Sequence, residues 1–307
     1  MAAPRFDVLS YGTLGVDRIL RVPHLPTADL STHSTSETIC LGGKATNSAV
    51  LLARWGLSVA ISGTAIGHDE TGKTFYRMLE EHPGVNTEYV GRRNGKPSMY
   101  CCILVTPDGE RAIIGVNVDE GEPTPPTPEM IEDAHVLTLD LYGGQERVHA
   151  ARLAADAGRP VIVGDLRDPQ HAILESCTVA IASAAEVRSS HPGVTLAEYA
   201  DTVQDSGTGN VIITEGGQGV YVFPESGGSL RLQAPKVNVV DTTGAGDAFR
   251  AGVTYGIRKG LPLVECAAIG TVAGSLNVQR VGASSDLPSL AEAEELAEAV
   301  LRTATRL

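Results

Sequence analysis

The sequence predicts an α/β protein built on a mostly parallel sheet, and three observations favour this fold class. Short runs rich in Val, Ile, Leu and Ala alternate with longer segments whose apolar residues recur at helical spacing. A chain of 307 residues is long enough for one large α/β domain with a small appendage. With 42% hydrophobic and 20% charged residues, its composition is that of a globular protein. The alternation is typical of a parallel sheet with helices on both faces.

Most expected elements follow this alternation along the chain. The expected strands are 6–11, 59–62, 136–141, 161–164, 179–182 and 211–214. The expected helices are 45–55, 71–81, 145–157, 196–204, 248–259 and 290–301. A further strand is expected at 236–240, and a hairpin is expected after residue 220 around Gly227 and Gly228.

Two segments break the alternation and predict a separate small β-sheet. They are 16–40 and 97–116, and the second contains a strand pair around the Pro-Asp-Gly turn at 107–109. The acidic, proline-rich stretch 119–129 follows, and its composition indicates an exposed, stiff connection back to the main sheet.

Charge and cysteine content narrow the class of protein. A formal net charge of −13 opposes binding to nucleic acid or to anionic lipid surfaces. No window of the sequence approaches a membrane span, and the first residues pass into a strand without a long apolar leader. The 5 cysteines show no metal-ligand spacing and form a poor disulfide framework. A cytoplasmic enzyme with no nucleic-acid or membrane partner is expected.

The most informative stretch is VVDTTGAGDAFRAG, in which a Gly-rich turn precedes an amphipathic helix. Gly244, Ala245 and Gly246 fall at the expected helix start, where unsatisfied N–H groups and the helix dipole favour an anion such as phosphate. Asp247 cannot be that anion and is better suited to accept a proton from an attacking hydroxyl. Such a turn is also an ordinary junction, so phosphoryl transfer to an alcohol is a hypothesis at this point.

A second motif, LGGKATNSAV at 41–50, combines with DTTGAGDAF at 241–249 to give a specific resemblance. Both resemble the signatures of the ribokinase-like, or PfkB-type, carbohydrate kinases. The resemblance implies a ribokinase-like three-layer sandwich whose small β-sheet acts as a lid. It also implies ATP-dependent transfer of the γ-phosphoryl group to a hydroxyl of a small carbohydrate, ribose-like or ketohexose-like, with Mg²⁺ and in some relatives K⁺.

The resemblance divides the chain between a main domain and the lid. The nucleotide- and substrate-binding domain would comprise 1–15, 41–96 and 119–307, and the lid would comprise 16–40 and 97–118. An exposed face of the lid could pair two subunits, so a homodimer through the lid is expected.

The same resemblance assigns the sugar-binding residues. Gly42 and Gly43 would allow the backbone to approach a sugar, while Lys44 and Asn47 would hydrogen-bond its hydroxyls. Asp17, after the first strand, would accept hydrogen bonds from further hydroxyls. In the mechanism that the family implies, Asp247 is the base, and the amides of 244–247 hold the transferring phosphoryl group.

Nucleotide and metal residues are assigned by weaker patterns. ITEGGQGVYVF resembles the family's nucleotide segment and would contribute Thr214, Gly216, Gly217 and Gly219, although a plain β-turn explains it equally well. SAAE resembles an Asn-x-x-Glu element in which Glu186 acts on Mg²⁺ through water. Asp241 and Thr243 are candidates for a monovalent-cation site.

The chain departs from the family pattern at Gly15 and Ser183, where asparagine is usual, and at Asp286, where ribokinases tend to have serine. Because glycine at position 15 removes a polar contact to the sugar, the sequence does not identify which sugar is bound. A nucleoside kinase and a sugar-binding regulator without catalysis therefore stay as alternatives. A dinucleotide-dependent oxidoreductase is disfavoured because GTLGVD replaces the expected GxGxxG.

Three further features are interpreted as structural. GHDETGKT at 67–74 fits the Walker A pattern, but Asp69 and Glu70 would oppose phosphate, so a capped helix start is predicted. Arg111 and Arg167 could reach an anion, yet both are typical of solvated surface charges.

Overall fold

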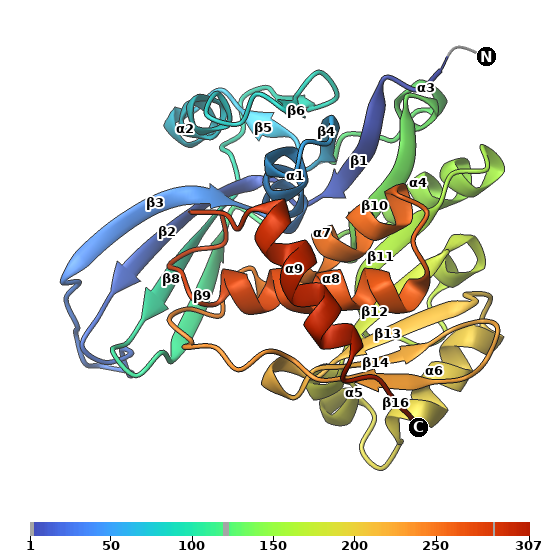
Figure 1. The fold of residues 1–307 in the computed structure, drawn as a ribbon. Helices are drawn as coiled ribbons and strands as arrows, with labels where there is room; N and C mark the ends of the chain where they lie inside the picture. The colour runs from blue at the N-terminus through green and yellow to red at the C-terminus, as the bar shows by residue number, and fades with distance from the viewer. Residues whose placement is uncertain (1–2, 119–122, 285) are drawn as a thin grey trace.

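A ten-stranded sheet forms the middle of the molecule. The computed structural model describes residues 3–118, 123–284 and 286–307. The strand order is β16-β15-β14-β13-β12-β11-β10-β1-β4-β6, and neighbours from β13 to β6 are parallel (Figure 1). The parallel strands are β1 (Phe6–Gly12), β4 (Val59–Gly63), β6 (Val85–Asn86), β10 (Ala134–Asp140), β11 (Val161–Leu166), β12 (Val179–Ser183) and β13 (Asn210–Thr214). The antiparallel edge comprises β14 (Val220–Phe223), β15 (Leu230–Leu232) and β16 (Thr305–Arg306).

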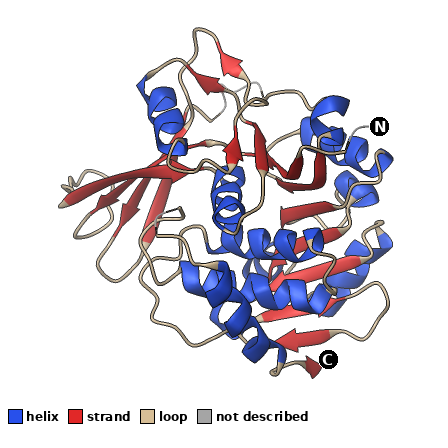
Figure 2. Cartoon of the chain, turned by 45° about the horizontal axis from the view of Figure 1, so that its top comes forward, coloured by secondary structure: helices blue, strands red, loops and turns tan. Residues whose placement is uncertain are grey.

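Helices cover both faces of this sheet, which gives the three layers that were expected (Figure 2). One face packs against α1 (Lys44–Arg54), α7 (Ala245–Arg258), α8 (Leu263–Asn277) and α9 (Leu290–Leu301). The other packs against α3 (Pro128–Glu132), α4 (Gln145–Asp156), α5 (Ala184–Ser190) and α6 (Leu196–Asp205). Neighbouring residues of β1 show the division, since Val8 enters the first core and Leu9 the second. Within the described residues, no helix is both long enough and apolar enough to span a membrane.

A separate four-stranded sheet projects from one side of this body (Figure 1). Its order is β3-β2-β8-β9, with β2 (Gly15–Arg21), β3 (Ser36–Gly42), β8 (Tyr100–Val105) and β9 (Arg111–Val116). A small apolar core of Ile19, Cys40, Ile103 and Val105 holds it together. The strand β3 ends at Gly42, and α1 begins at Lys44, so this sheet runs directly into the main body. Residues 119–122, the start of the expected connection at 119–129 and of the expected domain segment 119–307, lie outside the described residues.

The prediction of a strand at 236–240 is wrong. Among the residues that the structure describes, this segment pairs with no strand, and Val239 and Val240 are 59% and 43% exposed. The N–H groups of Val240 and Asp241 both donate to the carbonyl of Val278, which lies outside the sheet. The β-branched residues favour an extended backbone, but β15 and β16 already occupy the sheet edge.

The Walker-like segment forms a capped helix start, as predicted. Asp69 is the N-cap of α2 (Glu70–Leu79), and its Oδ1 accepts a hydrogen bond of 3.1 Å from the N–H of Gly72. The lysine of the pattern, Lys73, pairs with Glu70 at the surface. A phosphate cradle is therefore absent from this segment, because the capping carboxylate occupies the place of the anion.

Candidate active site

The Gly-rich turn leads directly into α7. Gly244 is the N-cap residue and adopts φ +77°, a left-handed conformation that L side chains rarely take. A Cβ at this position would lie 2.3 Å from the Cβ of Ala283, so both conformation and space require glycine. No side chain caps the helix, and the N–H of Ala245 donates to the carbonyl of Thr242 at 3.4 Å, which leaves the N–H groups of Gly246 and Asp247 available to an anion.

Asp247 lies in the first turn of α7, and residues of α1 hold it in place. Its Oδ2 accepts a hydrogen bond of 2.8 Å from Nδ2 of Asn47, and its backbone carbonyl accepts one of 2.9 Å from the hydroxyl of Ser48. Only 6% of Asp247 is exposed. Residues 200 positions apart thus form one buried contact, which unites the two motifs.

Burial raises the pKa of Asp247. The nearby positive charges of Lys44 and Arg250 and the hydrogen bond from Asn47 oppose this rise, while the charge of Asp165 adds to it. The ammonium of Lys44 lies 3.9 Å from Oδ1 of Asp247. A carboxylate with a raised pKa is a stronger base than an exposed one, which suits proton abstraction.

Lys44 is held between two carboxylates. Its Nζ donates a hydrogen bond of 2.8 Å to Oδ1 of Asp165 and lies 4.9 Å from the centre of the Tyr142 ring. Burial alone would lower the pKa of Lys44, but the charges of Asp247 and Asp165 outweigh it and raise the pKa above its ordinary value. Lys44 is therefore a fixed positive charge beside Asp247.

Asp17 lies on β2 of the small sheet and is buried against Gly42. Burial, followed by the charge of Asp247, raises the pKa of Asp17 to about 7, while a hydrogen bond from Cys101 opposes the shift. The structure thus brings Asp17 into the electrostatic field of Asp247, together with Lys44 and Asn47. These side chains are suited to accept and donate hydrogen bonds to the hydroxyls of a small molecule.

A small cavity lies at the carboxyl ends of β11, β12 and β13, beside the start of α7. Its volume is about 70 Å³. Four residues singled out in the sequence, Ser183, Glu186, Thr214 and Gly246, line it together with Asp165 and Arg250. Gly216, Gly217 and Gly219 do not line it, because the chain turns away after β13 in a single 3₁₀ turn, Gly216–Gln218.

Glu186 is paired with Arg167 rather than free. The Oε1 of Glu186 lies 2.7 Å from Nη2 of Arg167, which also donates 2.7 Å to the hydroxyl of Tyr142. Among the described residues no cluster of three or more His, Cys, Asp or Glu side chains could hold a metal. Mg²⁺ is often bound through one or two carboxylates plus substrate phosphates and water, and Glu186 at the cavity fits that mode.

Asp241 and Thr243 connect the loops around the start of α7. The two carboxylate oxygens of Asp241 accept hydrogen bonds of 2.9 Å from the N–H groups of Thr243 and Gly282. The hydroxyl of Thr243 accepts one of 3.1 Å from Nη1 of Arg111 on β9. Arg111, interpreted from the sequence as a surface charge, therefore links the small sheet to the main body.

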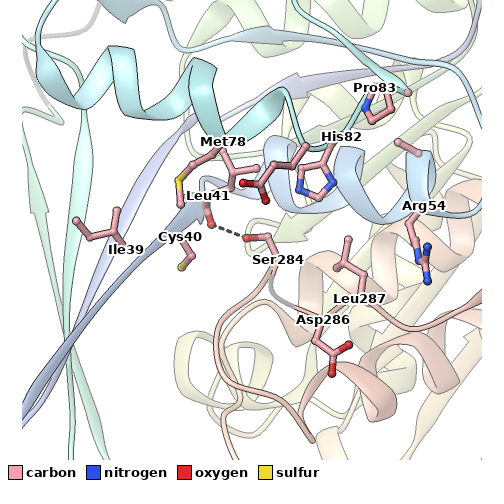
Figure 3. A pocket seen from close by; sticks show the side chains of 13 residues that line it. Ile39, Cys40, Leu41, Arg54, Met78, His82, Pro83, Ser284, Asp286 and Leu287 are labelled. Atoms are coloured by element: carbon pink, nitrogen blue, oxygen red, sulfur yellow. Dashed lines mark hydrogen bonds between the residues drawn. The ribbon is translucent and has the colours of Figure 1, made fainter.

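A much larger cavity lies elsewhere, and none of the expected site residues lines it (Figure 3). It has a volume of about 650 Å³ and lies among β3, the ends of α1 and α2, and the loop around Ser284. The hydroxyl of Ser284 donates 3.0 Å to the carbonyl of Leu41, which separates this cavity from the glycines that follow.

Sequence reasoning missed two residues of the site, Asp165 and Arg250. Asp165 follows the apolar run VIVG near the carboxyl end of a strand. The same kind of position indicated Asp17 as a ligand-binding residue, so it could also have identified Asp165. Arg250 has no comparable signal, because an arginine in an amphipathic helix is normally exposed and here is only 2% exposed.

Asp17→Asn is expected to stabilise the folded protein at alkaline pH. The pKa of Asp17 is raised from 3.8 to about 7, so the folded protein favours the neutral form of this carboxyl. The contribution of Asp17 to the free energy of unfolding is therefore complete below pH 3.8 and is lost as the pH rises through 7. The variant should equal wild type near pH 4 and exceed its free energy of unfolding by roughly 1–3 kcal/mol at pH 8. Urea unfolding across this range measures the difference.

Asp7→Asn is the matched control. The pKa of Asp7 is lowered by hydrogen bonds from Ser58 and by Arg258, which outweigh its burial, so its loss should destabilise the protein at neutral pH. A pH-independent effect of Asp17→Asn would contradict the raised pKa.

Comparison with known proteins identifies the family of this chain. A family model described as "pfkB family carbohydrate kinase" matches residues 5–290. Ribokinase of Haemophilus influenzae is 26% identical over 302 residues, which cover 94% of this chain and 97% of that protein.

Solved structures show the same fold. Arabidopsis thaliana ribokinase, solved with ribose and ATP, superimposes with a TM-score of 0.83 at 24% identity and covers 97% of this chain and 99% of its own. The nucleoside kinase of Methanocaldococcus jannaschii gives a TM-score of 0.79 at 19% identity, covering 97% and 100%. The family match spans nearly the whole chain, so the protein belongs to the pfkB family of carbohydrate kinases, phosphotransferases that act on a sugar hydroxyl.

Proposed function

We propose that this protein transfers the γ-phosphoryl group of ATP to a hydroxyl of a small sugar, with Asp247 as the base. One observation carries the proposal: a buried carboxylate lies in the first turn of α7, whose uncapped N–H groups can hold the phosphoryl group being transferred. A base and an anion site are thus adjacent on one helix. The ATP complex of the similar Arabidopsis ribokinase supports ATP as the donor.

The reaction follows from these positions. The acceptor hydroxyl gives its proton to Asp247 as its oxygen forms a bond to the γ-phosphorus, and the bond to the β-phosphate oxygen breaks to release ADP. The amides of 244–247 hold the charge on the equatorial oxygens, and Lys44 remains cationic beside the base. Mg²⁺, when bound, neutralises phosphate charge, and Glu186 is the residue that would hold it through water.

The remaining predicted residues divide between the two substrates. Asp17, Gly43, Lys44 and Asn47 would orient the sugar. Because Asp17 lies on the small sheet, that sheet would cover the acceptor. Thr214 would contact phosphate from the small cavity. Gly216, Gly217 and Gly219 would contact the rest of the nucleotide. Asp241 and Thr243 would contribute to a K⁺ site.

Two acceptor classes are proposed. A free ribose-like or ketohexose-like sugar is favoured by the similarity to H. influenzae ribokinase and by Lys44 and Asp17 beside the base. A nucleoside is the alternative, because the nucleoside kinase of M. jannaschii has the same fold and a nucleoside presents its ribose in the same way.

An ATP-coupled screen over pentoses, aldohexoses, ketohexoses, sugar phosphates and nucleosides tests the proposal. ADP release that depends on a free sugar supports the first acceptor class, and release only with nucleosides supports the second. Sugar binding without ADP release from any acceptor would instead identify a regulator and contradict the kinase proposal.

Asp247→Ala is expected to fold normally and to lose phosphoryl transfer by about 10²–10⁴-fold, because no other carboxylate replaces the base. Steady-state kcat with the best acceptor of the screen measures the loss. Lys73→Ala is the control, since this lysine of the Walker-like pattern only pairs with Glu70 at the surface and its loss should leave kcat unchanged. Near wild-type turnover of Asp247→Ala would refute the assignment of the base.

We also propose that the small sheet pairs two copies of the chain. Its strands expose large apolar side chains, with Ile113 and Ile114 of β9 56% and 52% exposed and Ile39 of β3 39% exposed. Such strands normally find a partner or carry charges. Ile114→Asp should convert the dimer to a monomer in sedimentation velocity, whereas a monomeric wild type would contradict the proposal.

A further inference from the structure

Arg250 is an unusual residue for its position in α7. It follows Asp247 by three residues and Gly246 by four, so all three lie on one side of the first two helical turns. Only 2% of Arg250 is exposed, and it is among the largest fully buried side chains of the described residues. Because burying a guanidinium costs free energy unless its N–H groups are satisfied, the partners of Arg250 need to be identified.

Two of its three nitrogens are satisfied within the protein. The Nη2 donates hydrogen bonds of 2.7 Å to the carbonyl of Lys44 and 3.0 Å to the hydroxyl of Ser48, and Nε donates one of 3.3 Å to the same hydroxyl. These bonds fix the guanidinium plane against α1. The arginine is therefore preorganised and loses little conformational freedom when it binds a further group.

The third nitrogen, Nη1, is buried without a hydrogen-bond partner. The carboxylate of Asp165 approaches it, but its Oδ2 is 3.9 Å away, while its Oδ1 already accepts from Lys44. Nη1 thus has donor capacity that the folded protein does not use. Buried donors of this kind are uncommon in native structures and call for an explanation.

The residue that carries the unused donor lines the small cavity beside α7, and its Nη1 lies against Gly164, which also lines this cavity. Arg250 lines this cavity together with Gly246 at the helix start, Ser183 and Thr214. At about 70 Å³ the cavity has room for a group with several oxygens, and its polar walls come from α7, β12 and β13. The two carboxylates that also line this space, Asp165 and Glu186, are each paired with a cation. The guanidinium, the helix N-terminus and two hydroxyls therefore form a site for a tetrahedral oxyanion.

We infer that Arg250 is a phosphate-binding residue whose Nη1 donates to an oxygen of the terminal phosphate of the nucleotide. This inference rests on the proposed function, because it takes ATP as the ligand of the cavity. The sequence signature supplies backbone N–H groups for the phosphoryl group, and Arg250 adds a permanent charge from one turn deeper in the same helix. Since arginine does not titrate in proteins, this charge is independent of pH.

The position of Arg250 also connects the phosphate to the base. Its charge lowers the pKa of Asp247, and its Nη2 holds the backbone of Lys44, which lies beside the same carboxylate. A merely structural arginine would not distinguish nucleotides that differ in one phosphate. The test therefore compares such nucleotides directly by binding, without the acceptor.

The experiment measures the affinities of wild type and Arg250→Gln for ADP and for AMP-PNP, a non-hydrolysable ATP analogue, by titration calorimetry with Mg²⁺ supplied. Loss of one charge-assisted hydrogen bond should weaken AMP-PNP binding by about 10–100-fold and ADP binding by less than about threefold. Equal losses for the two nucleotides, or no loss, would overturn the inference.

Arg258→Gln is the matched control. Arg258 is the last residue of α7, and it pairs with Asp7 at 2.7 Å, far from the cavity lining. This variant should bind both nucleotides as wild type does. A selective loss of AMP-PNP affinity in Arg258→Gln would show a general effect of helix charge and overturn the role of Arg250.

Ser183→Leu provides an independent test if Arg250→Gln does not fold. Ser183 lines the cavity from β12, and its side chain makes no capping hydrogen bond to α5. Leucine would fill the cavity without touching the partners of Arg250, so AMP-PNP affinity should again fall selectively, and unchanged affinity would overturn the site. A wild type that binds neither nucleotide would instead contradict the proposed function itself.

Discussion

The contact between α1 and α7 around Asp247 is the constraint on which the rest of the site depends. Asn47 holds the carboxylate and Ser48 holds the backbone carbonyl of the same residue, so α7 can take only one position relative to α1. Each helix begins at the end of a Gly-containing loop, and both pack on the same face of the sheet. The proposed base, the start of α7 that we propose to bind phosphate, and the cation Lys44 are therefore positioned by the same two buried hydrogen bonds.

Electrostatic balance explains why a buried carboxylate is tolerated there. Lys44 and Arg250 both approach Asp165, and both lower the pKa of Asp247. The buried carboxylates are thus offset by two cations that lie close to them. Asp165 itself adopts φ +60°, an uncommon conformation for a residue other than glycine, and such strain is concentrated at functional sites.

Much of the fold could be predicted because its signals are local. Apolar runs and helical spacing indicate most of the elements, and the glycines before α7 mark its start. The prediction of a strand at 236–240 was wrong because β-branched residues favour an extended backbone whether or not a partner strand is available. Arg250 could not be found, because its burial depends on Lys44 and Ser48, some 200 positions away.

The continuity of β3 with α1 has a mechanical consequence. The whole of β3 pairs within the projecting sheet, and its last residue, Gly42, lies two residues before the start of α1, which carries the side chains that hold Asp247. Asp17, whose pKa the charge of Asp247 raises, lies on the adjacent strand β2. We therefore expect a displacement of the projecting sheet to strain the start of α1 and to change the distance between these two carboxylates. Under the proposed function, closure of this sheet over the acceptor and the pKa of the base would be coupled.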